Sequence, residues 1–154
     1  MIKLAETVIR ILQGRSLATA ESCTGGGIGQ LLTAVPGSSA VYKGGIISYT
    51  NEIKQRLLMV PEELLIRFGA VSAPVAEAMA QGARQQLNSD IAVSVTGLAG
   101  PGGDDFRNPV GTVFLGYADD SCCISREFHF SGDRHAVREQ AVCAALSWIV
   151  EQNR

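Results

Sequence analysis

Residues 16–35 read SLATAESCTGGGIGQLLTAV, and the fold class follows from the pattern inside this stretch. The segment 16–21 predicts a short buried strand, and the segment 26–35 predicts a helix whose start is loosened by glycine. A strand joined to a helix by a tight turn is the building unit of α/β proteins. Because ligands of such proteins bind beyond the carboxyl ends of strands, Ser22 marks a candidate site.

The same alternation of strands and helices continues along the chain. Beyond 16–35, strands are predicted at 42–50, 90–97, 110–118 and 122–130, and helices at 3–13, 51–58, 61–69, 73–87 and from 134 to about 152. The last two strands are joined by a DDS turn and predict an antiparallel hairpin. We therefore expect an α/β domain on a mixed, mostly parallel sheet of about five strands, with the hairpin in its C-terminal half.

Composition excludes several classes of protein. Hydrophobic residues make up 46% of the chain and charged residues 18%, which is typical of a globular domain. The formal net charge is -2 without a dense cluster of Lys and Arg, so no nucleic-acid partner is expected. No apolar run reaches membrane-spanning length, and the first residues lack a signal peptide, so we expect a cytoplasmic protein without a membrane partner. An apolar final helix with Trp148 suggests a homo-oligomer.

Neither the cysteines nor the acidic residues indicate a metal site. The four cysteines, at 23, 122, 123 and 143, form no C-x-x-C pair, and the interpretation as free thiols in or near a core is favoured. Asp104 and Asp105 are adjacent in a loop, where solvation explains them better than metal binding. We expect neither a metal nor an organic cofactor.

The glycine turn after Ser22 has two interpretations. A helix start there offers N–H groups and a positive dipole end to a phosphate or an oxyanion. Alternatively, Ser22 and Thr24 only cap the helix. The turn is not a Walker loop, a G-x-S-x-G elbow or an S-x-x-K motif, and Gln30 stands where the dinucleotide fingerprint needs its third glycine.

A second strand end carries SYTNEIK, residues 48–54. A lysine in a partly dry site loses its charge more easily and can take a proton from a serine hydroxyl, which a nearby tyrosine can relay or steady. Tyr49 and Lys54 are therefore candidate partners of Ser22, better placed than a Ser-His-Asp triad. The alternative is a solvated lysine and a core tyrosine.

Two further segments could hold an anion. Thr96 and Gly97 end a strand and lead into a glycine-rich loop whose backbone could wrap a ligand, although such loops are sometimes only mobile. Asp133 can cap the final helix. Arg134 and Arg138 share a face of that helix and together could hold a phosphate. The alternative is that both are ordinary surface arginines. The segments of Ser22, Lys54 and Thr96 all end at probable strand termini, so we expect them to converge on one common pocket.

Six ordered motifs carry a resemblance to a known family. They are ATAESCTGG, VPGSSAVYKGGIISYTNEIK, FGAVSAPVAEAMAQGA, TGLAGPGG, PVGTVFLGYA and FSGDRHAVREQAV. From about residue 5 to 150 the chain resembles the C-terminal domain of the competence/damage-inducible protein CinA, whose stand-alone form is nicotinamide-nucleotide amidase. The resemblance implies a three-layer α/β/α sandwich and a single domain over residues 1–154, without the separate N-terminal pyrophosphatase domain of full-length CinA.

The resemblance also implies an activity, the hydrolysis of the carboxamide of nicotinamide mononucleotide (NMN) to nicotinate mononucleotide and ammonia. It makes Ser22 the nucleophile and Tyr49 and Lys54 its activators. The implied substrate-binding residues are Thr24, Gly25 and Gly26, which would hold an oxyanion through backbone N–H groups, and Thr96, Gly97, Gly100 and Arg134, which would hold the nucleotide.

Departures from the family pattern are confined to other positions, namely Thr50, Met59 and Leu98. Two alternatives stay open. One is a nucleotide-binding module of the same fold without turnover, and the other is an amidase or esterase with different substrates.

Overall fold

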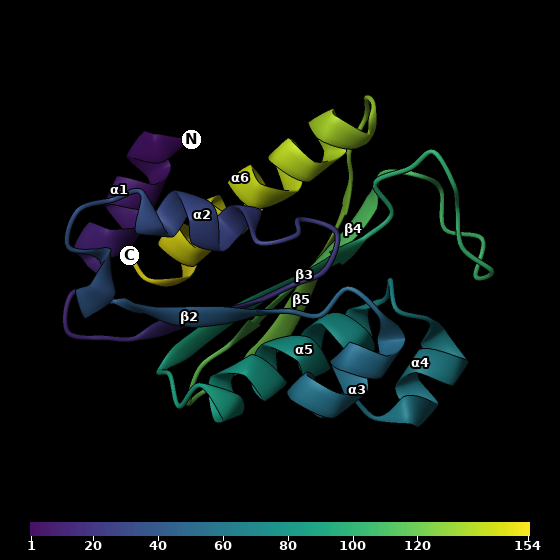
Figure 1. The fold of residues 1–154 in the computed structure, drawn as a ribbon, viewed down its shortest axis with the longest axis horizontal. Coiled ribbons are helices and arrows are strands. Elements are labelled where there is room, and N and C mark those ends of the chain that lie inside the picture. Colours follow the sequence, from purple (N-terminus) through teal and green to yellow (C-terminus); the bar gives the residue numbers. More distant parts are fainter.

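The computed structural model describes all residues 1–154 and contains one five-stranded sheet (Figure 1). The strand order is β2-β1-β3-β4-β5, with bounds Tyr42–Ile47, Leu17–Glu21, Ile91–Gly97, Thr112–Ala118 and Cys123–His129 in that order. β1 pairs in parallel with both β2 and β3, whereas β3 with β4 and β4 with β5 are antiparallel. Only β4 runs against the other strands, so the predicted mixed, mostly parallel sheet and its C-terminal hairpin are confirmed.

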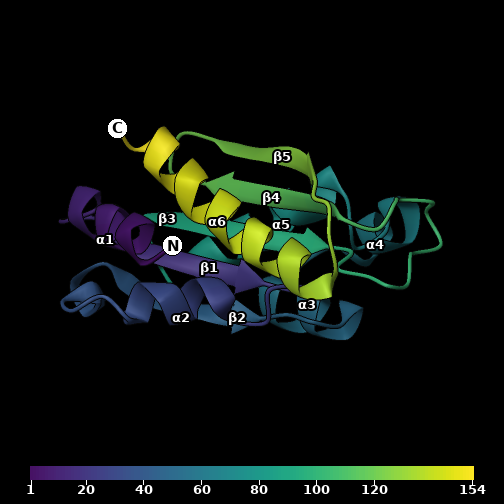
Figure 2. The same ribbon diagram turned by 90° about the horizontal axis from the view of Figure 1, so that it is seen from above.

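Helices cover both faces of the sheet, which gives the expected three layers (Figure 2). One face carries α1, α2 and α6, which span Ile2–Ile11, Gly27–Thr33 and Arg134–Gln152. The other carries α3, α4 and α5, which span Asn51–Leu58, Glu62–Phe68 and Ala73–Gln86. A single 3-10 turn, η1, covers Ser38–Ala40 where a turn was expected. None of the helices combines the length and the hydropathy needed to cross a bilayer.

The hydrophobic core is divided by the sheet into two parts. The larger cluster packs α1, α2 and α6 against the sheet, and the smaller one lies under α3, α4 and α5. Trp148 belongs to the larger cluster, where its ring packs beside Tyr117. It is only 1% exposed, so the idea that this side of α6 offers Trp148 to a second copy is wrong.

Side-chain caps fix where two of the helices begin. Thr50 accepts from the N–H of Ile53 at the start of α3, and Asp133 accepts from the N–H of Ala136 at the start of α6, as the sequence suggested. Ser72 occupies the predicted N-cap position of α5, but its hydroxyl donates to the carbonyl of Gly69 instead.

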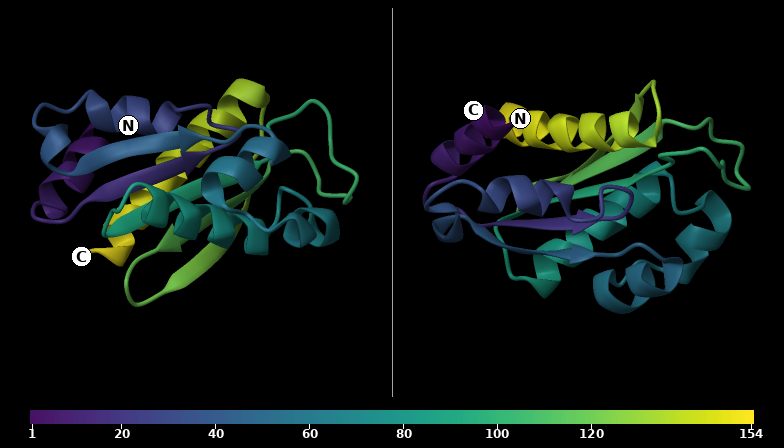
Figure 3. Two further views of the ribbon diagram at one scale, coloured as in Figure 1. Left: turned by 60° about the horizontal axis from the view of Figure 1, so that its bottom comes forward. Right: turned by 45° about the horizontal axis from the view of Figure 1, so that its top comes forward.

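Gly44 lies at an irregularity of the β1–β2 pairing, and Gly45 lets β2 approach β1 closely. The register between the strands shifts by one residue beside Leu17 and Ala18, and a Cβ at Gly45 would overlap the hydroxyl of Thr19. The irregularity and the close approach predicted for Gly44 and Gly45 are both present. The loop from β3 to β4 projects beyond the edge of the sheet (Figure 3).

Candidate active site

The carboxyl ends of β1, β2 and β3 meet at one edge of the sheet (Figure 2). Ser22 directly follows β1, and its N–H donates to the carbonyl of Val95 in β3 at 3.0 Å. Ser48 directly follows β2, and its N–H donates to the carbonyl of Glu21 at 2.8 Å. These backbone bonds fix the segments after β1 and β2 in the positions from which their side chains act.

Ser22 and Lys54 are brought together although 32 residues separate them. The Nζ of Lys54 lies 2.9 Å from the Oγ of Ser22. It also donates to two backbone carbonyls, at 2.7 Å to Ser48 and at 3.3 Å to Tyr49. Lys54 is only 1% exposed and Ser22 only 7%, so the solvated lysine that the sequence left open is not observed.

Burial without an opposite charge controls the protonation of Lys54. No carboxylate lies within ion-pair distance of its Nζ, and its three acceptors are all neutral. Desolvation therefore lowers the pKa of Lys54 from 10.5 to about 8. A substantial fraction of the side chain is then a neutral amine just above neutral pH, which is the state that can accept a proton.

Cys23, the residue after Ser22, is excluded as a competing nucleophile. The thiol is buried, and burial raises its pKa to about 11. The reactive form of cysteine is the thiolate, which is scarce at neutral pH when the pKa is this high. Ser22 is thus the hydroxyl that Lys54 can activate, and the thiol beside it stays protonated.

The start of α2 is capped by Glu21, which the sequence analysis did not foresee. Its carboxylate accepts from the N–H groups of Ile28 at 2.9 Å and Gly29 at 3.1 Å, and from the hydroxyl of Thr24 at 2.6 Å. The interpretation of Ser22 and Thr24 as helix caps is therefore wrong. The expectation that α2 offers free N–H groups to a ligand is wrong for the same reason.

Free backbone donors lie in the turn before α2 instead. The N–H of Gly25 donates to the carbonyl of Ser22, but those of Cys23, Thr24 and Gly26 have no acceptor within the chain. Gly26 has φ +101°, a left-handed conformation that favours glycine. The glycines at 25 and 26 therefore shape a turn that presents N–H groups next to the serine.

Tyr49 and Arg134 are joined by a hydrogen bond near the serine–lysine pair. The guanidinium of Arg134 donates to the hydroxyl of Tyr49 at 3.1 Å and to the carbonyl of Gly100 at 2.7 Å. Tyr49 is 60% exposed, so it is not the core tyrosine of the alternative interpretation. Its hydroxyl has no hydrogen bond to Ser22 or Lys54, and these two contact each other directly without a relay.

Thr96 and Gly97 lie at this edge but are engaged in packing. Thr96 is buried, and its hydroxyl donates to the carbonyl of Ala70 at 2.8 Å. A Cβ at Gly97 would come within 2.7 Å of Val113 and 3.2 Å of the sulfur of Cys23. The absent side chain of Gly97 lets β3 pack against the turn that follows Ser22.

Arg138 acts apart from Arg134, although the two share a helix face. Its guanidinium donates to the carbonyls of Cys23 at 3.0 Å and Thr24 at 3.4 Å. It therefore holds the turn after Ser22 from the side of α6, while Arg134 reaches the loop after β3.

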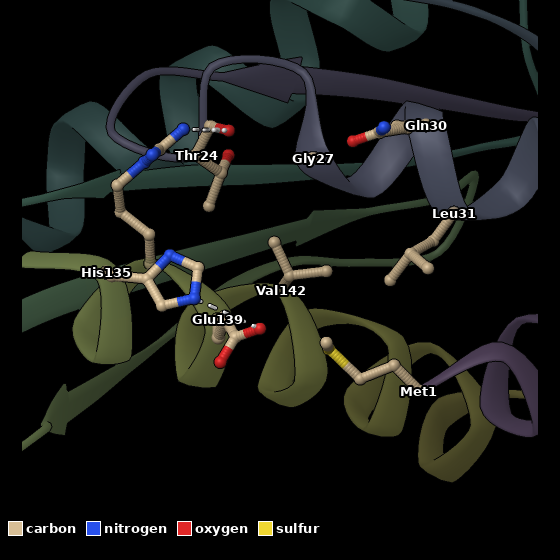
Figure 4. Close-up of a pocket in the computed structure, with 9 residues that line it drawn as sticks. Met1, Thr24, Gly27, Gln30, Leu31, His135, Glu139 and Val142 are labelled. Atoms are coloured by element: carbon tan, nitrogen blue, oxygen red, sulfur yellow. Dashed lines mark hydrogen bonds and ion pairs between the residues drawn. The ribbon is translucent and has the colours of Figure 1, made fainter.

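A cavity of about 270 Å³ lies behind this turn, between α2 and α6 (Figure 4). Thr24 and Gly27 line one wall, while His135 and Val142 of α6 line the other, and Met1 closes one end. Neither Ser22 nor Lys54 lines it, so this hollow is separate from the serine–lysine pair.

In the β3–β4 loop, Asp104 holds the loop itself and no metal site is formed. No group of three or more His, Cys, Asp or Glu side chains is placed to share a metal ion. The carboxylate of Asp104 accepts from the N–H groups of Phe106 and Asn108 and from the side-chain amide of Asn108.

Sequence reasoning missed the roles of Glu21 and Ser48 and misplaced Arg138. A signal for Glu21 was present, because a charged residue at the end of an otherwise uncharged, buried strand needs compensating donors. Nothing in the sequence singles out the carbonyl of Ser48, since any residue at that position supplies one.

Comparisons with known proteins agree with the fold. A family model described as "CinA C-terminal domain" matches residues 1–152. A CinA-like protein of Synechococcus sp. (strain RCC307) is 56% identical over 151 residues, which cover 95% of this chain and 36% of that protein. Another, of Parasynechococcus marenigrum, is 53% identical over 148 residues, which cover 93% of this chain and 35% of that protein. The chain thus spans about a third of the curated relatives it matches.

Solved structures of similar size are also close in fold. A competence or damage-inducible protein from Enterobacter asburiae superposes with a TM-score of 0.97 at 34% identity, covering 99% of this chain and 98% of that one. A competence/damage inducible protein from Agrobacterium tumefaciens superposes with a TM-score of 0.95 at 39% identity, covering 99% of this chain and 95% of that one.

Proposed function

The chain belongs to the CinA C-terminal domain family, and we propose that it is an amidase that hydrolyses the carboxamide of NMN to nicotinate mononucleotide and ammonia. The observation that carries the proposal is the 2.9 Å contact between Lys54 Nζ and Ser22 Oγ in a buried setting. A serine hydroxyl beside a buried lysine is an arrangement suited to nucleophilic attack on an acyl carbon.

The hydrogen bonds of Lys54 favour its action as a base. An ammonium has three N–H donors, whereas a neutral amine has two donors and one lone pair. The carbonyls of Ser48 and Tyr49 take two donors. In the neutral form the remaining lone pair faces Ser22, whose hydroxyl then donates its proton to the amine.

The reaction then proceeds through an acyl-enzyme on Ser22. As Ser22 Oγ bonds to the carboxamide carbon, its proton passes to Lys54, and the carbonyl oxygen becomes an oxyanion. The oxyanion accepts from the free N–H groups of the turn, of which a single donor is typically worth ~2.7–4 kcal/mol in other hydrolases. Lys54 returns its proton to the departing nitrogen, and ammonia leaves. Water then attacks the acyl-enzyme with Lys54 again as base, the bond from Ser22 Oγ to the acyl carbon breaks, and the proton held by Lys54 passes to Ser22 as nicotinate mononucleotide is released.

The phosphate of NMN is assigned to Arg134 and the glycine loop after Thr96. Both partners of the Arg134 guanidinium are neutral oxygens, so no carboxylate neutralises its charge. An arginine in this state is well suited to a phosphate. The exposed N–H groups of Gly102 and Gly103 have no acceptor within the chain and can add to the same site. Tyr49, held by Arg134, would contact the sugar or the ring of the substrate.

Ammonia release from NMN by the purified protein tests the proposal. We expect turnover by the wild type, and a loss of at least about 10³-fold in kcat for Ser22→Ala and for Lys54→Ala, because each removes part of the attacking unit. Lys43→Ala is the matched control, since Lys43 is an exposed lysine that donates to the carbonyl of Asn88. Binding of NMN without turnover would favour the non-catalytic module.

Substrate selectivity separates the NMN amidase from a general amidase or esterase. We expect NMN to be preferred over nicotinamide riboside and nicotinamide, because only NMN carries the phosphate. Arg134→Ala should raise KM for NMN and reduce the preference, in kcat/KM, for NMN over nicotinamide riboside. Equal rates on all three compounds would contradict a phosphate site.

A further inference from the structure

Glu21 is a buried carboxylate at the end of β1, next to the nucleophile. Glu21 is only 2% exposed, and no Lys, Arg or His lies within ion-pair distance of its carboxylate. A buried charge is costly unless hydrogen bonds compensate it. Because nothing cationic accounts for this carboxylate, its role must be sought in the donors around it.

Those donors come from two different segments. The hydroxyl of Thr24 belongs to the turn after Ser22, and the N–H groups of Ile28 and Gly29 belong to the first turn of α2. The positive end of the helix dipole also favours a negative charge at this position. The carboxylate therefore ties the turn to the helix that follows it.

The hydrogen bonds of Glu21 distinguish the backbone N–H groups of α2 from those of the turn before it. The donors of α2 are used inside the protein by Glu21, whereas the N–H groups of Cys23, Thr24 and Gly26 in the turn have no acceptor. A turn not anchored to the helix could rotate these N–H groups away from Ser22. Because a displacement of about 1 Å in a catalytic group can cost about 10²-fold in rate, the anchor matters for chemistry as well as for folding.

We propose that Glu21 is a positioning residue of the oxyanion site: together with Arg138, which holds the turn from the side of α6, its carboxylate fixes the turn so that the free N–H groups face the oxygen on which charge develops. The inference rests on the proposed serine chemistry but not on the identity of the substrate. Glu21 itself lies behind the turn, engaged with Thr24, Ile28 and Gly29, and does not contact the reacting atoms.

A fluorophosphonate probe tests this assignment without NMN. In the labelling step the Oγ of Ser22 bonds to phosphorus, fluoride leaves, and the serine proton passes to Lys54. Charge develops on the phosphoryl oxygen, so the rate depends on the oxyanion donors. The second-order rate constant is followed by intact mass, with the modified residue located by peptide mapping.

Glu21→Gln is the informative variant. A glutamine offers one oxygen and an NH₂ donor where three donors converge, so at least one bond to the turn or to α2 is lost. We expect labelling of Ser22 to slow about 10- to 100-fold relative to the wild type. Glu77→Gln is the matched control, because Glu77 accepts from the hydroxyl of Ser125 on the far strand β5 and should label at the wild-type rate.

Thr24→Val is the second variant, for the case that Glu21→Gln does not fold. It removes only the bond of Glu21 to the turn and leaves the backbone bonds to α2 in place. We expect it to slow labelling in the same direction, with the folded fraction checked by circular dichroism. For both variants the kcat for NMN should fall while KM changes less than twofold, because the donors act on the transition state.

The outcomes separate this inference from the proposed function. Folded Glu21→Gln or Thr24→Val protein that labels within twofold of the wild type overturns the role of Glu21, whatever the activity on NMN. An equal slowing in Glu77→Gln also overturns it. A wild type that labels at Ser22 but releases no ammonia from NMN refutes the substrate and leaves the positioning role supported by the slower variants.

Discussion

The amine of Lys54 is buried in the protein, and all of its hydrogen-bond partners are neutral. The carbonyls of Ser48 and Tyr49 and the hydroxyl of Ser22 satisfy its hydrogen bonds but do not stabilise its charge as a carboxylate would. The pKa of about 8 is the result, and it is a statement about stability as well as reactivity. In the proposed mechanism this unfavourable core residue is retained because it activates the serine.

Lys54→Met tests this cost through the pH dependence of stability. The folded pKa of about 8 lies below the ordinary value of 10.5, so between these values the unfolded chain binds more protons than the folded one. The penalty for burying the ammonium is complete below pH 8 and is relieved as pH rises towards 10.5. The wild type should therefore gain stability relative to Lys54→Met across this window, by up to ~1.4 kcal/mol per pH unit.

Denaturant unfolding of the two proteins at pH 7, 8, 9 and 10 measures this difference. Because Met has a similar length and no charge, the contributions of other titrating groups largely cancel. A difference in the free energy of unfolding that stays constant from pH 7 to pH 10 would show that Lys54 is not perturbed by burial.

At the scale of elements, the site is built where short strands end and helices begin. β1 is followed by the turn of Ser22, β2 is followed by α3 with Lys54, and α6 begins at Arg134. The starts of α3 and α6 are fixed by Thr50 and Asp133, so caps as well as strands determine where the functional side chains lie.

Asp133→Ala tests the contribution of a cap. Its carboxylate accepts from the N–H of Ala136 at 2.9 Å, and the loss of such a cap typically costs ~0.5–2 kcal/mol. We expect a fall of this size in the free energy of unfolding, together with a higher KM for NMN because Arg134 sits in the loosened turn. Asp133→Asn should retain most of the stability. Asp120→Ala, an equal charge change at an exposed position of the β4–β5 turn, is the control and should be nearly neutral.

The elements were predictable because their signals are local. Strand runs, the glycine turn, and the caps at Thr50 and Asp133 are readable within a few residues of sequence. The meeting of Ser22 with the segment of Lys54 was also predictable, since parallel strands place their carboxyl ends at one edge.

The environments of the side chains were not predictable, since tertiary packing determines them. Lys54 lies in the polar segment NEIKQR yet points inward, while Tyr49 points outward. The cap of α2 comes from Glu21, which precedes the helix by several residues, where rules for adjacent caps do not apply.

At the scale of the whole molecule, one sheet edge gathers residues from distant parts of the chain. Ser22, Lys54, Gly100 and Arg134 come from four segments. Side-chain hydrogen bonds join Lys54 to Ser22 and Arg134 to Tyr49, and Arg134 also donates to the carbonyl of Gly100. The loop after β3 and the start of α6 lie over the same edge as the ends of β1 and β2 (Figures 1 and 2). A homo-oligomer stays a prediction.

The most direct test of the serine–lysine pair is the pH dependence of fluorophosphonate labelling at Ser22. We predict a rate constant that rises with pH to a plateau with a midpoint near the Lys54 pKa of about 8, and a large loss of labelling in Lys54→Met at every pH. Labelling of Lys54→Met at the wild-type rate, or modification at a residue other than Ser22, would contradict activation of the serine by this lysine.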